Sequence, residues 1–200
     1  MIYCATERAA AFAETIARFR PAVRVIAGLA EIDDPEPVAI GLQGLVDPEA
    51  PSRGVVPADW RLGRRLAETV LDPNLRFVDI ASARTLHQLR QELASTATRL
   101  SLSDVDLSAV TGSHRRLTQA CARYIYDQMD QSGQPRYAGV RYLSRLHGAW
   151  ECWAVFANRM RHSPGMPVSI FPNDPGLLEA AAVFGLSIES FEGHYLRPWR

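Results

Sequence analysis

The chain has 200 residues, of which 47% are hydrophobic and 22% are charged, values typical of a folded globular protein. Its 22 basic and 22 acidic residues balance, so no overall charge attracts it to nucleic acid or to an anionic membrane. Every basic residue is arginine. The absence of lysine excludes P-loop nucleotide hydrolases, pyridoxal-phosphate enzymes and protein kinases, because each class needs a lysine in its active site.

The cysteines and the N-terminal sequence indicate the cellular compartment. Cys4, Cys121 and Cys152 lie far apart and form no CxxC motif, a pattern that argues against a disulfide framework or a cysteine-rich zinc site. The first residues lack the basic and apolar regions of a signal peptide. No stretch reaches the ~18 apolar residues of a membrane-spanning helix. We therefore expect a cytoplasmic protein with no membrane partner.

Hydrophobic periodicity predicts mixed secondary structure in the first part of the chain. The predicted elements are a strand at 2–5, a helix at 7–19, strands at 23–29 and 38–42, and a helix at 60–70. Between them, residues 43–59 carry three Pro and two Gly and predict a long loop. A binding loop or lid and a tolerated surface insertion are both consistent with that composition.

The second part of the chain continues the mixture. The predicted elements are a strand at 75–80, a helix from the Ser82 cap to about 100, a helix at 114–131 capped by Ser113, strands at 137–143, 152–157 and 168–171, a helix from the Asp174 cap to 184, and a short strand or tail at 186–200. Because strands and helices do not alternate strictly, the sequence predicts an α+β fold, with one domain over residues 1–200.

The familiar catalytic motifs are missing, and one metal motif is weak. The chain contains no GxGxxG, HExxH or GxSxG, and no two histidines stand at ligand spacing. Asp104 and Asp106 form a DxD motif that could hold a divalent metal. The same pattern occurs more often as the polar edge of a loop before a helix. We favour that interpretation and predict no metal site.

Glu14 is the first candidate functional residue. At ~100° per residue it lies off the apolar stripe of its helix, beside the small residues Ala10 and Ala17. A carboxylate among small side chains lets a ligand approach closely. The alternative is an ion pair with Arg18, four residues on, at a solvated face.

Two further features carry arginine. His114, Arg115 and Arg116 open a predicted helix, where cations oppose the helix dipole, so they either complete an anion site or are simply solvated. Arg141 lies inside the otherwise apolar strand of GVRYLSRLHGAW, which continues into Ser144. A buried arginine needs an anionic partner, and either a structural carboxylate or a ligand phosphate satisfies that need.

Several segments, in order along nearly the whole chain, resemble the RES-domain family, the toxin halves of bacterial toxin–antitoxin pairs. In IYCATERAAAFAE a Tyr precedes a Glu by eleven positions, as Tyr3 precedes Glu14. The other similar segments are LRFVDI, LTQACARYI, GVRYLS, WAVFANR and DPGLLEAAAVFGL. Each motif alone has low specificity, so the order of the segments carries the resemblance.

The resemblance implies an ADP-ribosyltransferase-like fold, a split and mostly antiparallel sheet with flanking helices. It implies NAD+ as the substrate, with no other cofactor, and cleavage of the nicotinamide–ribose bond by phosphorolysis or hydrolysis. Protein ADP-ribosylation is the alternative reaction, and a non-catalytic RES-like binding protein is the alternative class. The implied partners are a helix-turn-helix antitoxin and a second copy of the chain, with no direct contact to nucleic acid.

The resemblance also implies roles for four residues. Glu14 is expected to stabilise the oxocarbenium-like transition state, and Ser144 to orient the nicotinamide amide or a catalytic group. Tyr3 is expected to stack on the substrate or to form a hydrogen bond with it, and Arg141 to hold its pyrophosphate. The family's arginine lies on a strand upstream of the tyrosine and has no counterpart in this chain, so a version extended by that strand is expected to be more active.

Overall fold

The computed structural model describes residues 1–23, 26–27, 54–160 and 165–190, and the chain divides into two compact units. The first unit comprises residues 1–11 and 67–167, and the second comprises residues 12–66 and 168–200. Each unit is thus made from two separate stretches of sequence. The prediction of one domain over residues 1–200 stays a prediction.

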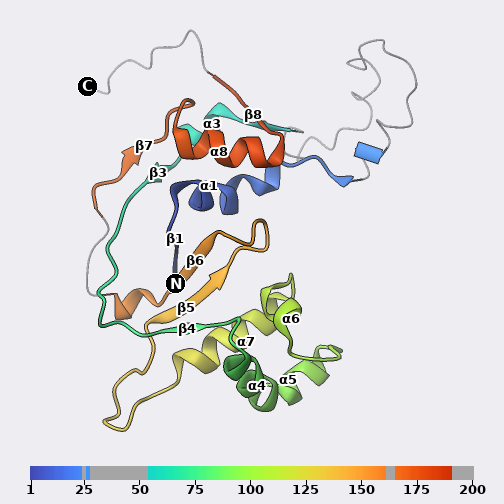
Figure 1. The fold of residues 1–200 in the computed structure, drawn as a ribbon, viewed down its shortest axis with the longest axis vertical. Helices are drawn as coiled ribbons and strands as arrows, with labels where there is room; N and C mark the ends of the chain where they lie inside the picture. The colour runs from blue at the N-terminus through green and yellow to red at the C-terminus, as the bar shows by residue number, and fades with distance from the viewer. Residues whose placement is uncertain (24–25, 28–53, 161–164, 191–200) are drawn as a thin grey trace. The chain divides into compact units, whose positions relative to one another are not determined.

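A four-stranded mixed sheet organises the first unit, with strand order β1-β6-β5-β4 (Figure 1). Its strands are β1 (Ile2–Ala5), β4 (Phe77–Asp79), β5 (Gly139–Leu143) and β6 (Glu151–Val155). Strand β6 runs antiparallel to β1 and β5, whereas β4 and β5 are parallel. A mixed sheet with flanking helices confirms the expected combination of helices and strands.

Four helices of the first unit share a core with one face of this sheet. They are α4 (Ala83–Glu92), α5 (Ala94–Arg99), α6 (Leu107–Thr111) and α7 (Arg115–Tyr126). Successive strand residues face opposite sides, and the register aligns Val78, Val140 and Ala154 on the helical side. These three residues join buried helix residues such as Leu89 and Leu117 in one hydrophobic cluster. The other face of the sheet is therefore the one available for polar groups of these strands.

The second unit contains short elements around two small sheets. It holds the end of α1 (Arg8–Ile16), η1 (Ala17–Phe19), α3 (Ala58–Leu62) and α8 (Pro175–Phe184). Strand β2 (Val55–Val56) pairs in parallel with β8 (Ser187–Ile188), and β3 (Arg65–Leu66) pairs antiparallel to β7 (Val168–Ser169). Its fully buried side chains include Phe12, Ile16, Val56 and Leu177.

Most predicted helices and strands are present. Their first or last residues differ from the prediction where capping or strand pairing determines the boundary. Ser82 and Asp174 cap their helices as predicted, each accepting a backbone N–H through its side chain. The cap of α7 is His114 rather than Ser113, and this helix ends at Tyr126. The helix predicted at 60–70 is instead the short α3 followed by β3, because residues 65–66 pair with β7.

Two other predictions fall partly outside the described residues. The strand predicted at 38–42 and most of the loop predicted at 43–59 lie outside them, and the described end of that loop contains β2 and the start of α3. Of the strand predicted at 23–29, the described residues 23, 26 and 27 are helical.

All three cysteines lie in the described part and are free thiols. Burial raises the pKa of the Cys121 thiol to about 11. A thiol with so high a pKa is a poor nucleophile near neutral pH, so Cys121 serves as a core residue of the first unit. Across the described residues, no helix has both the length and the apolar composition needed to cross a membrane.

Gly139 is required by the close approach of β5 and β6. A Cβ at this position would collide with the carbonyl oxygen of Ala154 and lie 3.0 Å from the Cα of Val155. Gly139→Ala is therefore expected to destabilise the protein by about 1–3 kcal/mol, the usual cost of overpacking. The free energy of unfolding in urea measures the effect. Gly148→Ala is the matched control, because nothing lies within 4 Å of a Cβ there. Equal stability of the two variants would contradict this account of the strand contact.

Candidate functional site

Arg141 joins two carboxylates across three strands of the first unit. Its Nη1 lies 2.9 Å from Asp79 Oδ2 on β4, and its Nε lies 2.5 Å from Glu151 Oε1 on β6. The register explains this grouping, because Asp79 pairs with Arg141 and Glu151 pairs with Leu143, all on the same sheet face. Of the two alternatives for an arginine in this strand, the structure contains the structural carboxylates.

Thr6 and Trp153 extend this network toward β1. The Thr6 hydroxyl donates to Glu151 Oε2 at 2.6 Å, and the Trp153 indole N–H donates to Thr6 Oγ1 at 3.1 Å. The Thr6 hydrogen bond, followed by the contact with Arg141, lowers the pKa of Glu151 below its usual value. The same network raises the pKa of Arg141, chiefly through Glu151. We call Thr6, Asp79, Arg141, Glu151 and Trp153 the Arg141 network.

The charge of the Arg141 network matters for ligand binding. One guanidinium faces two carboxylates, so the network is formally negative, and the Arg141 side chain is 34% exposed. An approaching pyrophosphate would meet both carboxylates as well as the arginine. The role of Arg141 in holding a pyrophosphate stays a prediction, and the geometry assigns this residue a structural role in joining β4, β5 and β6.

Ser144 stabilises the turn that connects β5 to β6. Only 3% of the residue is exposed, and its Oγ accepts a hydrogen bond from the backbone N–H of Leu146 at 3.0 Å. Its own N–H donates to the Trp150 carbonyl at 2.8 Å, which closes the connection. This is a turn-forming serine, and its proposed orienting role toward a substrate stays a prediction.

Tyr3 and Arg141 point to opposite faces of the sheet. Tyr3 pairs with Ala154, which pairs with Val140, whereas Arg141 is the next residue along β5. The resemblance implies that both residues contact the substrate, but because strand side chains alternate, they do not lie on one face of this sheet. Tyr3 is 69% exposed, so its ring is accessible on its own face.

Glu14 lies in the second unit, on α1, where it is exposed. Of the two small residues expected beside it, Ala17 is half-buried, whereas Ala10 is fully buried in the core. The open small-residue face expected around Glu14 is therefore narrower than the helical wheel indicates. The catalytic role of Glu14 stays a prediction.

The DxD motif has a structural explanation, whereas the arginines beside His114 are exposed. Asp104 pairs with Arg90 at 2.8 Å, and Asp106 caps α6 by accepting the N–H of Ala109. The motif therefore forms the polar loop edge before a helix. Among the described residues no group of three or more His, Cys, Asp or Glu side chains is suitable for a metal. Arg115 and Arg116 are exposed in the first turn of α7.

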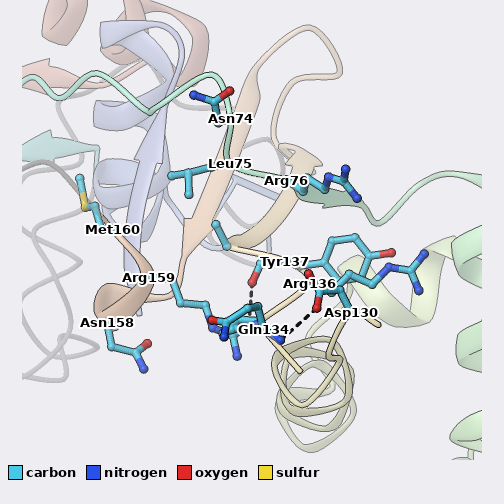
Figure 2. Close-up of a pocket in the computed structure, with 12 residues that line it drawn as sticks. Asn74, Leu75, Arg76, Asp130, Gln134, Arg136, Tyr137, Asn158, Arg159 and Met160 are labelled. Atoms are coloured by element: carbon cyan, nitrogen blue, oxygen red, sulfur yellow. Dashed lines mark hydrogen bonds between the residues drawn. The ribbon is translucent and has the colours of Figure 1, made fainter. Parts of the chain in front are cut away.

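A cavity that the sequence did not indicate lies at the other end of the sheet, where β4 and β5 begin (Figure 2). It has a volume of about 520 Å³. Three arginines line it: Arg76 directly before β4, Arg136 before β5 and Arg159 after β6. We call this the arginine cavity. Its remaining lining residues are Asn74, Leu75, Asp130, Gln134, Pro135, Tyr137, Ala138, Asn158 and Met160.

Only topology brings these arginines together. Parallel pairing of β4 and β5 places the residues that precede both strands at the same edge, and antiparallel β6 ends at that edge. Each of the three arginines lies close to the end of a strand. This position beside a strand is the one pattern in the sequence that could have indicated the cavity. That signal becomes useful only when the order and direction of the strands are known.

No protein-family model, curated protein or solved structure matches this chain.

The Arg141 network makes stability depend on pH. Because the folded-state pKa of Glu151 is lowered, its contribution is present above the pKa of the unfolded chain and is lost as the pH falls through the folded value. Glu151→Gln is expected to be less stable than wild type at pH 7, with a smaller difference near pH 3. Urea unfolding at a series of pH values measures both. Glu92→Gln, which removes an exposed carboxylate outside the network, is the control. A stability difference that does not change with pH would contradict the assignment.

Proposed function

We propose that this protein binds NAD+ and cleaves its nicotinamide–ribose bond, as a RES-type toxin with an ADP-ribosyltransferase-like fold. The observation that carries the proposal is the order of similar segments along nearly the whole chain, beginning with the strand and helix that bear Tyr3 and Glu14. Local structure supports the resemblance of this first segment, because β1 is followed at once by α1 and the side chains of Tyr3 and Glu14 are both exposed. A cytoplasmic location and a helix-turn-helix antitoxin partner belong to the same proposal.

The proposed chemistry needs few protein groups. The C1′–N bond of NAD+ breaks, the electron pair leaves with neutral nicotinamide, and positive charge develops on the ribose. The carboxylate of Glu14 stabilises that charge, and the oxygen of water or phosphate then bonds to C1′ with loss of its proton. When a protein side chain takes the place of water, the same steps give ADP-ribosylation. Tyr3 contributes a face for stacking.

A non-catalytic binding protein of the same family is the second candidate. Two observations favour it. Arg141 is already paired with Asp79 and Glu151, and Tyr3 lies on the opposite sheet face from Arg141. Both observations argue against a substrate cleft shared by Tyr3 and Arg141 in the first unit. The exposure of Glu14 and Tyr3 is compatible with contact to a ligand or an antitoxin.

Glu14→Gln is expected to lower NAD+ cleavage about 10²–10³-fold without loss of the fold, because Gln keeps the shape but removes the stabilising charge. Nicotinamide release by the purified proteins is the measurement. Glu179→Gln is the matched control, since it removes an exposed helical carboxylate of the same unit. Equal rates for wild type and Glu14→Gln would remove Glu14 from the mechanism. No release by the wild-type protein would reject the enzyme and leave the binding protein.

Tyr3→Ala is expected to raise the KM for NAD+ up to about tenfold, the loss of one stacking contact. Because Tyr3 is 69% exposed, the free energy of unfolding should change by no more than about 0.5 kcal/mol. Tyr3→Phe keeps the ring and should retain the wild-type KM. An unchanged KM in Tyr3→Ala would show that the ring does not contact the substrate.

A further inference from the structure

The arginine cavity contains more positive than negative charge. Arg76, Arg136 and Arg159 line it, and Asp130 is the one acidic residue in its lining. Within the described part of the chain, none of these arginines lies within ion-pair distance of a carboxylate. The cavity therefore attracts an anion, and its charge is not explained by structural ion pairs as that of Arg141 is.

The carboxylate of Asp130 forms hydrogen bonds within its own loop. Its Oδ1 accepts hydrogen bonds from the N–H and the hydroxyl of Ser132. It also accepts one from the N–H of Gln134 (Figure 2). These bonds, with a smaller contribution from the charge of Arg76, hold the pKa of Asp130 below its usual value. The carboxylate thus remains ionised and shapes the loop between α7 and β5.

Arg159 has a structural task that fixes the cavity wall. Its Nη1 donates to the Tyr137 carbonyl at 2.5 Å and its Nη2 donates to the Tyr126 carbonyl at 2.6 Å. Its guanidinium carbon lies 4.0 Å from the centroid of the Tyr126 ring. The side chain thereby joins the end of α7 to the segment before β5, and it adds a positive charge to the cavity lining.

Arg76 and Arg136 are the two arginines placed to contact a ligand. Both are exposed, and they come from the segments that precede neighbouring parallel strands. The Ala138 N–H donates to the Arg76 carbonyl at 2.7 Å, which fixes the spacing of the two backbones. The Arg136 guanidinium carbon lies 5.2 Å from the centroid of the Tyr137 ring. Two guanidinium groups with a neighbouring aromatic ring suit a phosphate attached to a planar group.

The size and polarity of the cavity narrow the ligand class. Its volume of about 520 Å³ lies within the ~300–1,000 Å³ of small-molecule sites and exceeds the need of an inorganic ion. Side-chain amides of Asn74, Gln134 and Asn158 add hydrogen-bonding groups to the lining. This combination suits an organic phosphate that carries further polar groups.

We propose that the arginine cavity binds an organic phosphate of mononucleotide size, with Arg76 and Arg136 holding the phosphate groups. This site does not depend on the proposed NAD+ cleavage. Tyr137 and Ser144 flank opposite ends of β5, and the seven residue steps from one to the other span roughly 23 Å of extended chain.

Binding of ADP to the full chain, measured by isothermal titration calorimetry, tests the proposal. The double variant Arg76→Gln/Arg136→Gln is expected to bind ADP at least tenfold more weakly than wild type. Arg99→Gln, which removes an exposed arginine from the end of α5, is the control and should bind within twofold of wild type. The urea midpoints of all variants are compared, so that loss of binding is separated from loss of fold.

Competition experiments identify which part of the ligand is recognised. Pyrophosphate should displace ADP, whereas adenosine and sulfate at the same concentration should not. No binding of ADP at millimolar concentration, or equal binding by wild type and the double variant, would overturn the proposal. Displacement by sulfate as strong as that by pyrophosphate would also overturn it, because the cavity would then attract any anion. Since nicotinamide release is not measured here, failure of NAD+ cleavage leaves these outcomes unchanged.

Discussion

The position of β5 between a parallel and an antiparallel neighbour is the constraint on which the rest of the first unit depends. Its pairing with β4 aligns Asp79 with Arg141, and its pairing with β6 brings Glu151 to the same sheet face. The close backbone approach at Gly139 allows this arrangement. One end of β5 thus leads into the Arg141 network and the Ser144 turn, and its other end leads into the arginine cavity.

Arginine has a structural role at some positions of this lysine-free chain and a proposed ligand-binding role at others. Arg141 joins strands through carboxylates, and Arg159 joins α7 to the start of β5 through two backbone carbonyls. In the second unit, the buried Arg61 donates to the Glu189 carbonyl in the same way. A planar guanidinium with five donors suits such cross-links, and lysine could not replace it. An arginine engaged in this way has fewer donors left for a ligand, which separates Arg141 from Arg76 and Arg136.

This distinction affects the choice between catalysis and binding. A substrate site in the first unit would have to use groups that the fold has not already engaged, and Arg141 and Ser144 are both engaged in local structure. Tyr3 of the first unit and Glu14 of the second unit are both exposed. The proposal of NAD+ cleavage therefore depends mainly on these two residues, and the proposed anion site at the other end of the sheet is a separate property of the first unit.

The sequence alone determined the elements whose signals are local. Hydrophobic periodicity predicted β1, β5 and α8, and residue type predicted the helix caps at Ser82 and Asp174. Each of these signals depends on residues a few positions apart. It also showed that Arg141 needs an anionic partner, though not which one. Tertiary structure decided the partners, the opposite orientation of Tyr3, and the meeting of Arg76, Arg136 and Arg159. These depend on strand order, direction and register, which are properties of pairing between segments more than 60 residues apart in the case of Asp79 and Arg141. No local pattern encodes them, because pairing is selected by the packing of the whole core.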